Sequence, residues 1–250
     1  MSVVQTQFAG RVTLLRDKVA DFDVYPFCLP VVRTLESIEL HPKVTFLVGE
    51  NGSGKSTLLE ALAVALDFNP EGGSRNFNFS TRESHSDLHR YLRIGKGVRP
   101  RDGYFLRAES WFNLGTEIEK LDAEPAPSPP IINSYGHRSL HEQSHGESFM
   151  ALLKKRLGGQ GLYLFDEPEA ALSPSRQIEA LQRIHELVRK GSQFVIATHS
   201  PILMSYPDAL ILHCGPTGLQ PIRYEDTEHF RITRDFLLHR DKVLDILMGH

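Results

Sequence analysis

The sequence has few of the features that mark secreted, disulfide-bonded or membrane-spanning proteins. It contains only two cysteines, Cys28 and Cys214, which lie far apart, so we expect neither a disulfide framework nor a paired metal site. Scarce cysteine also favours a reducing compartment. No stretch approaches the roughly 20 apolar residues that a membrane span needs, and no basic segment followed by an apolar run opens the chain. We therefore expect a cytoplasmic protein without direct membrane insertion.

An excess of charge of one sign is also absent. The 28 basic and 31 acidic residues give a formal net charge of −3, which argues against a uniformly basic surface. A local basic cluster at Arg93, Lys96, Arg99 and Arg101 leaves a nucleic-acid contact open. Such clusters are more commonly solvated, and this one lacks interleaved aromatic residues, so nucleic acid is the weaker interpretation.

The pattern of apolar runs predicts an α/β fold with a mostly parallel sheet. Short strands are expected at Val12–Leu15, Phe27–Val32, Val44–Val48, Phe105–Ala108, Leu162–Phe165, Phe194–Ala197 and Leu210–Leu212. Helical patterns after several of these runs favour parallel strand–helix–strand units. At the end of the chain, Val243, Leu244, Ile246 and Leu247 predict a helix that docks on the body.

A glycine-rich motif follows the run Val44–Val48 and opens an apolar helix. Its sequence, Gly49-Glu50-Asn51-Gly52-Ser53-Gly54-Lys55-Ser56, fits the full P-loop pattern G-x-x-x-x-G-K-[ST]. The glycines let backbone N–H groups face phosphates, and the helix N-terminus adds a positive dipole end. The motif predicts that Lys55 reaches the β- and γ-phosphates of ATP and that Ser56 binds Mg²⁺.

Two carboxylates end the strand expected at Leu162–Phe165. Asp166 suits Mg²⁺ ligation through water, and Glu167 is free to orient or deprotonate an attacking water. Together with the P-loop, this pair predicts ATP hydrolysis.

Four segments in order resemble the ABC-type ATPases. Asp166-Glu167-Pro168-Glu169-Ala170-Ala171-Leu172-Ser173 is similar to their Walker B motif and D-loop, His199 to their switch histidine, and Ser144-His145-Gly146-Glu147 to a divergent signature motif. The resemblance covers about residues 40–215 and implies a P-loop NTPase with an N-terminal antiparallel β subdomain and a small helical signature subdomain. It also implies that two copies sandwich ATP, with Ser144 and Gly146 of one copy contacting the γ-phosphate on the other.

These observations give one set of expected site residues. The catalytic residues are Glu167, His199 and Lys55, and the metal ligands are Ser56 and Asp166. The ATP-binding residues are Gly49, Glu50, Asn51, Gly52, Ser53, Gly54, Lys55, Ser56, Thr57, Ser144 and Gly146.

The sequence departs from the family at several points. No convincing Q-loop glutamine is present, and Glu109 is a weak substitute. Either Tyr25 or Phe27 could stack on adenine, and either could equally be a core residue. His141-Glu142-Gln143-Ser144-His145 fits the zinc-protease pattern H-E-x-x-H, but it has no apolar face and overlaps the signature position, so we do not expect zinc.

We expect residues 1–250 to form a single ABC-type ATPase domain, with an insertion and the helical signature subdomain at about residues 75–150. The resemblance is to a compact, stand-alone group related to the chromosome-maintenance, RecF and overcoming-lysogeny-defect branch. The stretch between Lys55 and Ser144 is too short for a long coiled coil. We expect an ATP-dependent homodimer coupled to an unknown protein partner. The alternatives are the ATPase subunit of an ABC membrane transporter, or a slowly hydrolysing module that gates a genome-defence or DNA-repair effector.

Overall fold

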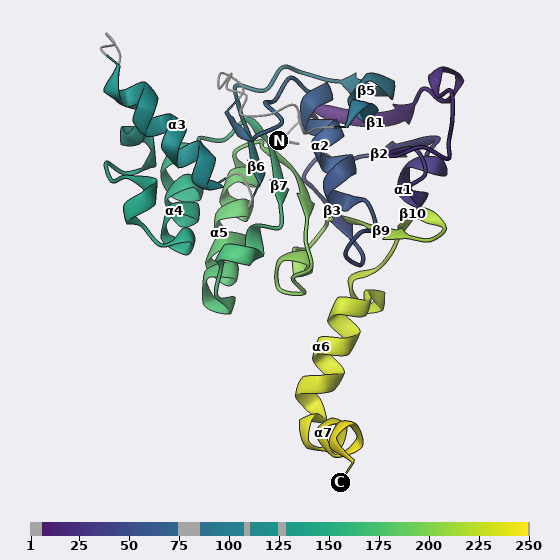
Figure 1. Cartoon of the computed structure of the whole chain (residues 1–250). Coiled ribbons are helices and arrows are strands. Elements are labelled where there is room, and N and C mark those ends of the chain that lie inside the picture. The colour runs from purple at the N-terminus through teal and green to yellow at the C-terminus, as the bar shows by residue number, and fades with distance from the viewer. Residues whose placement is uncertain (1–6, 75–85, 108–110, 125–128, 250) are drawn as a thin grey trace, which may run out of the picture.

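Two sheets and the helices around them make up the body of the protein, and two C-terminal helices extend from it (Figure 1). The structure, a computed structural model of the chain, describes residues 7–74, 86–107, 111–124 and 129–249. The main sheet has seven strands in the order β10-β9-β3-β8-β7-β6-β4. Its strands are β3 (Val44–Val48), β4 (Gly73–Ser74), β6 (Asp102–Arg107), β7 (Gly161–Asp166), β8 (Gln193–Ala197), β9 (Leu210–Gly215) and β10 (Gly218–Pro221).

The five central strands of this sheet are parallel, as the sequence predicts. β9, β3, β8, β7 and β6 run in one direction, whereas the edge strands β10 and β4 are antiparallel to their neighbours. Strands β3, β7 and β8 are buried along their whole length, which is why they read as continuous apolar runs. The loops after these three strands therefore emerge together where the parallel strands have their carboxyl ends, and this end of the strands is the sheet edge meant below.

The expected antiparallel subdomain is a separate three-stranded sheet. It pairs β1 (Ala9–Leu14) with β2 (Ser37–Glu39) on one side and with β5 (Leu92–Lys96) on the other. The basic cluster of the sequence is divided by this arrangement. Arg93 and Lys96 lie on β5, and Lys96 forms an ion pair with Asp67, whereas Arg99 and Arg101 lie beyond the strand.

Helices cover both faces of the main sheet and define two hydrophobic cores. One core packs α2 (Lys55–Ala65), α1 (Pro30–Arg33) and β1 against one face. The other core packs α5 (Pro174–Arg189), α4 (His145–Ala151) and the π-helical turn η5 (Leu152–Arg156) against the opposite face. The P-loop helix α2 and helix α4, which carries the predicted signature residues, are therefore on opposite faces of the sheet.

The segment predicted to form the helical signature subdomain lies between β6 and β7. It consists of α3 (Trp111–Ala123), two 3-10 turns at Ile131–Tyr135 and Leu140–Glu142, then α4 and η5. The stretch 75–150 also supplies β5 to the small sheet and β6 to the main sheet. The assignment of this whole stretch to an insertion and subdomain stays a prediction.

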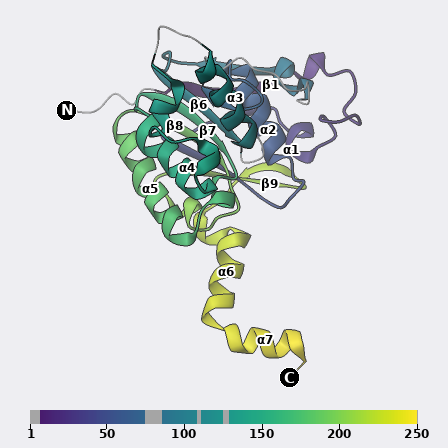
Figure 2. The ribbon, with the colours of Figure 1, turned by 60° about the vertical axis from the view of Figure 1, so that its left-hand side comes forward.

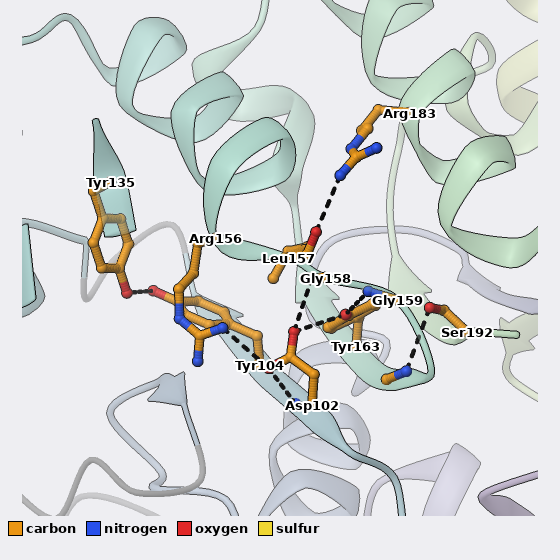
Figure 3. Close-up of polar contacts among 12 residues, drawn as sticks. Asp102, Tyr104, Tyr135, Arg156, Leu157, Gly158, Gly159, Tyr163, Arg183 and Ser192 are labelled. Atoms are coloured by element: carbon orange, nitrogen blue, oxygen red, sulfur yellow. Dashed lines mark hydrogen bonds and ion pairs between the residues drawn. The ribbon is translucent and has the colours of Figure 1, made fainter. Parts of the chain in front are cut away.

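A polar network joins the end of this helical segment to the start of the main sheet (Figure 3). Asp102 accepts hydrogen bonds from Arg156 at 3.1 Å, from the Gly158 N–H at 3.1 Å and from the Tyr163 hydroxyl at 2.9 Å. The Tyr104 and Tyr135 hydroxyls are 3.2 Å apart beside it. Burial raises the pKa of Tyr163, so this hydroxyl remains a neutral donor to Asp102.

The predicted strand Phe27–Val32 is wrong. The chain turns at this point and forms the short helix α1, which begins at Pro30. Proline suits the first position of a helix because its fixed φ is helical and its missing N–H has no partner there. Val31 and Val32 are fully buried on that helix and not on a strand.

The predicted docking of the C-terminal helix is also wrong. α6 (Glu228–Leu238) and α7 (Arg240–Met248) form an arm that points away from the sheets (Figure 2). Of the apolar side chains that suggested docking, Ile246 and Leu247 keep 72% and 73% of their surface accessible, and Val243 and Leu244 are only partly buried. Apolar spacing predicted the helix correctly, but it carries no information on whether the chain turns back toward the core.

Candidate functional site

The P-loop is shaped by glycines that other residues could not replace without strain. Gly54 precedes α2 with φ +95°, and a Cβ there would lie 2.6 Å from Val31 Cγ2. Gly49 has φ +148°, and a Cβ there would lie 2.4 Å from the carbonyl oxygen of Cys214. Both positions combine a backbone conformation and a close approach that require glycine. The loop thus turns tightly between the end of β3 and the N-terminus of α2.

Lys55 lies inside this loop, with only 4% of its surface exposed. Its ammonium donates to the carbonyls of Gly49 at 2.9 Å and Glu50 at 2.8 Å. Burial lowers the pKa of Lys55, while Cys214, Glu167, Asp166 and Glu169 act to raise it. Among the described residues these two carbonyls are its hydrogen-bond partners, so one of its three N–H donors is available for a phosphate oxygen.

Ser56 and Asp166 meet across the edge of the sheet. The Ser56 hydroxyl, in the first turn of α2, donates to Asp166 Oδ1 at 2.9 Å, and Asp166 is the last residue of β7. A hydroxyl and a carboxylate are oxygen donors of the kind that Mg²⁺ prefers, with remaining positions filled by water and phosphate. The pair therefore fits a Mg²⁺ ion beside the P-loop.

Glu167 and His199 face each other beside this pair. Glu167 has a left-handed backbone (φ 48°), and its N–H donates to the Ala197 carbonyl at the end of β8. Its Oε1 lies 3.5 Å from Nε2 of His199. The His199 N–H donates to Glu169 Oε1 at 2.5 Å. A strained backbone at a non-glycine residue persists only where the surroundings hold it, and such residues cluster at functional sites.

Enclosed polar atoms without a hydrogen bond also gather at this edge. Among the described residues, Ser53 Oγ, Glu169 Oε2 and His199 Nε2 are buried and form no hydrogen bond, although His199 Nε2 faces the Glu167 carboxylate at 3.5 Å. Such atoms are costly unless a ligand or water pairs with them. They come from the P-loop, the loop after β7 and the loop after β8, so the strand ends form one polar site that fits a phosphate and its metal ion.

The predicted signature residues, Ser144 and Gly146, lie at the start of helix α4. Ser144 caps the helix: its N–H and hydroxyl donate to Glu147 Oε2 at 3.0 and 2.8 Å, and Glu147 N–H donates to its hydroxyl. These hydrogen bonds to Ser144 lower the pKa of Glu147. A Cβ at Gly146 would lie 2.8 Å from the Ala171 carbonyl, so α4 packs closely on the loop after β7. Ser144 is exposed, on a helix that packs on the face of the sheet opposite to α2.

Comparison with known proteins agrees with this geometry. Residues 27–109 match the family described as "AAA domain", and residues 148–205 match "AAA domain, putative AbiEii toxin, Type IV TA system". The chain is 29% identical over 219 residues to a "Putative ABC transporter ATP-binding protein" of Caldanaerobacter subterraneus, covering 78% of this chain and 88% of that protein. The chain is an ABC-type P-loop ATPase.

Two other relatives share a smaller part of their length with this ATPase. It is 28% identical over 181 residues to "ABC transporter E family member 1" of Arabidopsis thaliana, covering 66% of this chain and 30% of that protein. It is 31% identical over 159 residues to the zinc import ATP-binding protein ZnuC of Mannheimia succiniciproducens, covering 62% of this chain and 55% of that protein. A solved structure titled as an inward-facing metal-chelate type ABC transporter has the same fold, with 16% identity, a TM-score of 0.51, and coverage of 91% of this chain and 88% of that one.

The zinc-protease pattern does not form a single helix in this ATPase. His141 lies in a 3-10 turn that ends at Glu142, Gln143 is extended, and His145 is the first residue of α4. The two histidines are therefore not one turn apart on a helical face, which the zinc-protease pattern requires.

The two candidates for adenine stacking occupy different environments. Phe27 packs in the α2 core, with its ring centroid 4.8 Å from that of Tyr91. Tyr25 is 60% exposed, and its hydroxyl lies 3.3 Å from the Thr57 hydroxyl in the first turn of α2. Tyr25 is thus the aromatic residue presented beside the P-loop. Glu109, the weak Q-loop substitute, lies outside the described residues.

The sequence did not point to two residues of the site. Glu169 fixes the backbone of His199, and its place in the Asp166–Ser173 string was the available signal. His229, on α6, contacts the ring of His199. No sequence signal distinguishes His229, because it is one of 12 histidines and lies in a polar segment outside the family motifs.

Proposed function

We propose that this ABC-type ATPase hydrolyses ATP to ADP and phosphate with Mg²⁺, in a complete site that forms between two copies of the chain. The observation that carries the proposal is the 2.9 Å contact of Ser56 with Asp166, because it joins the P-loop helix to the strand end that bears Glu167. A phosphate-binding loop, a Mg²⁺ ligand pair and a carboxylate for water are the parts that hydrolysis of a γ-phosphate requires.

Each site residue has a distinct role in the proposed reaction. The backbone of Gly49–Gly54 and the Lys55 ammonium bind the phosphates, and Thr57 and Tyr25, whose hydroxyls lie 3.3 Å apart at the first turn of α2, would contact the rest of the nucleotide. Ser56 and Asp166 hold Mg²⁺, which offsets phosphate charge when bound. Glu167 orients the attacking water and accepts its proton, and His199 donates a hydrogen bond toward the γ-phosphate.

The position of Ser144 supports a site shared by two copies. Ser144 and Gly146 begin α4, which packs on one face of the sheet, while the P-loop begins α2 on the other face. Figure 1 and Figure 2 both draw α4 and α2 on opposite sides of β7. The exposed helix N-terminus at Ser144 therefore suits the γ-phosphate of a second copy, to which it would add a hydroxyl and free N–H groups.

Replacement of Glu167 tests the hydrolysis. Glu167→Gln keeps the shape of the side chain but removes the base, so turnover should fall by roughly 10²–10⁴-fold while ATP binding stays intact. Steady-state phosphate release and fluorescent-ATP binding would measure the two quantities. Glu186→Gln is a matched control, since Glu186 lies on α5 and pairs with Arg183. Normal turnover by Glu167→Gln would overturn the assignment of this residue as the base.

Coupling to a separate partner is the proposed biological output, in the cytoplasm. No described helix is long and apolar enough to cross a membrane. A transporter role remains the alternative, because related proteins are described as import ATP-binding proteins. Co-purification with the ATP-held Glu167→Gln protein tests this point: an integral membrane protein among the bound components would favour the transporter role, and soluble components alone would favour the stand-alone ATPase.

A basic groove makes nucleic acid a second candidate partner. A cavity of about 1000 Å³ opens at the sheet edge opposite the P-loop and is lined by Lys43, Arg99, Arg101, Arg189 and Lys190, with Asp208 as the acidic residue. Asp208 pairs with Lys43. A phosphate backbone would suit the remaining cations, and binding should weaken steeply with salt. Fluorescence anisotropy with a labelled oligonucleotide should detect weaker binding by the double variant Arg99→Ala/Arg101→Ala than by the wild type. Equal binding by the two proteins would exclude this groove as the nucleic-acid site.

A further inference from the structure

We propose that His229, on the C-terminal helix α6, is a positioning residue that sets the tautomer and orientation of the switch histidine His199. The inference rests on the proposed function, because it assigns His229 a role through His199 in ATP hydrolysis. It also makes the C-terminal arm part of the hydrolysis site.

The two histidine rings are in direct contact. Nδ1 of His199 lies 3.0 Å from Nε2 of His229, and the ring centroids are 5.1 Å apart with the planes at 60°. The contact joins the loop after β8 to the first turn of α6, which is 30 residues further along the chain. Each ring is partly buried. One of the two nitrogens donates the shared hydrogen to the other.

The surroundings of His199 decide which nitrogen donates. Its other ring nitrogen, Nε2, faces the Glu167 carboxylate at 3.5 Å, and a carboxylate favours a proton on the nitrogen that faces it. In a neutral imidazole, Nδ1 is then the acceptor. His229 must therefore donate from Nε2–H to Nδ1 of His199. This hydrogen bond holds the tautomer in which His199 presents an N–H toward Glu167 and the phosphate site.

His229 is suited to act as a neutral donor. Burial, followed by the nearby His199 and Lys55, lowers the pKa of His229, which favours its uncharged ring. A neutral ring with its proton on Nε2 donates to His199 without placing a second positive charge beside Lys55.

The start of α6 is fixed to the same loop by a second contact. The Tyr224 hydroxyl donates to the Pro201 carbonyl at 2.9 Å, two residues beyond His199. The Tyr224 ring packs on Phe230 with centroids 4.6 Å apart, and the buried Thr227 caps α6 through the Phe230 N–H. The first turn of α6 is thus anchored by its own packing, and His229 reaches His199 from a fixed support. The rest of the arm points away from the body (Figure 2).

Kinetics of full-length variants test the role of His229. His229→Ala removes the donor, so kcat should fall by roughly 3- to 10-fold, the worth of one neutral hydrogen bond, while KM for ATP is unchanged. His229→Gln restores a donor and should recover most of the loss. His239→Ala is the matched control, because His239 is exposed on the same arm and its ring contacts the Asp235 carbonyl of its own helix. It should behave as the wild type.

A double variant separates positioning from general destabilisation. Because His229 acts through His199, His199→Ala/His229→Ala should be no slower than His199→Ala alone. A further loss in the double variant would overturn the positioning role. So would a loss in His229→Ala that His229→Gln does not recover.

Histidine side-chain NMR supplies a readout that needs no turnover. In the wild type, the His199 ring should carry its proton on Nε2, and in His229→Ala its ring ¹⁵N shifts should move toward a tautomer mixture. An unchanged His199 tautomer in His229→Ala overturns the inference. Absence of wild-type ATP turnover would instead contradict the proposed function, which keeps the two failures distinct.

Discussion

Lys55 is the residue on which nucleotide binding depends most directly. It is almost fully enclosed by the P-loop, and its ammonium is held by two backbone carbonyls. Lys55→Ala should weaken ATP binding by about 1.5–3 kcal/mol, the range for a hydrogen bond to a charged group. Isothermal titration of the folded variants would measure it, with Lys154→Ala as the control because Lys154 pairs on the surface with Glu179. Equal ATP affinity in the wild type and Lys55→Ala would contradict the P-loop assignment.

For single residues, the sequence predicts those whose role depends only on neighbouring positions along the chain. Gly49, Gly54 and Lys55 each meet a demand of the P-loop itself, so their spacing along the chain carried the information. Ser56 and Asp166 were each predicted as a Mg²⁺ ligand from their own motifs, and the structure shows that the two side chains are in contact. His229 reaches His199 only through the path of the chain after β10, and no local pattern records that path.

At the scale of elements, buried strands were easier to predict than amphipathic or proline-containing segments. β3, β7 and β8 are buried on both faces, so their sequences are continuous apolar runs bounded by turns. Phe27–Val32 has similar composition, but Pro30 starts a short helix there. The spacing of Val243, Leu244, Ile246 and Leu247 predicted a helix, and α7 is one, but its packing depends on the chain direction after Pro221.

Attachment of the helical segment to the main sheet should depend on Asp102. It accepts from Arg156, Gly158 and Tyr163, which come from both sides of the connection (Figure 3). Asp102→Ala leaves the half-buried guanidinium and the Tyr163 hydroxyl without their acceptor. It should lower the free energy of unfolding by about 2–3 kcal/mol. Chemical denaturation followed by circular dichroism would measure the change.

A surface ion pair supplies the control for this substitution. The ion pair between Asp67 and Lys96 is exposed to solvent, and exposed pairs of this kind contribute about 0–1 kcal/mol to the free energy of unfolding. Lys96→Ala, which removes the other partner of this pair, should therefore have little effect on the free energy of unfolding. If Asp102→Ala and Lys96→Ala change the free energy of unfolding equally little, the network does not hold the helical segment to the sheet.

At the scale of the whole molecule, a single chain carries both parts of the proposed ATP site, but it carries them at different places on the main sheet. The P-loop, Asp166, Glu167 and His199 converge at one sheet edge, while Ser144 begins a helix on the face opposite to α2. ATP that contacts both copies binds the dimer better than the monomer, so mass action must favour the dimer when hydrolysis is blocked.

The mass of the Glu167→Gln protein with and without ATP tests the shared site most directly. By light scattering in Mg²⁺, this variant should have twice the monomer mass of 28.2 kDa at saturating ATP and the monomer mass in ADP. Adding Ser144→Arg, which places a bulky side chain at the α4 N-terminus, should keep the protein monomeric in ATP without loss of ATP binding. A Glu167→Gln protein that binds ATP but remains a monomer at saturation, with or without co-purified components, would contradict the shared site.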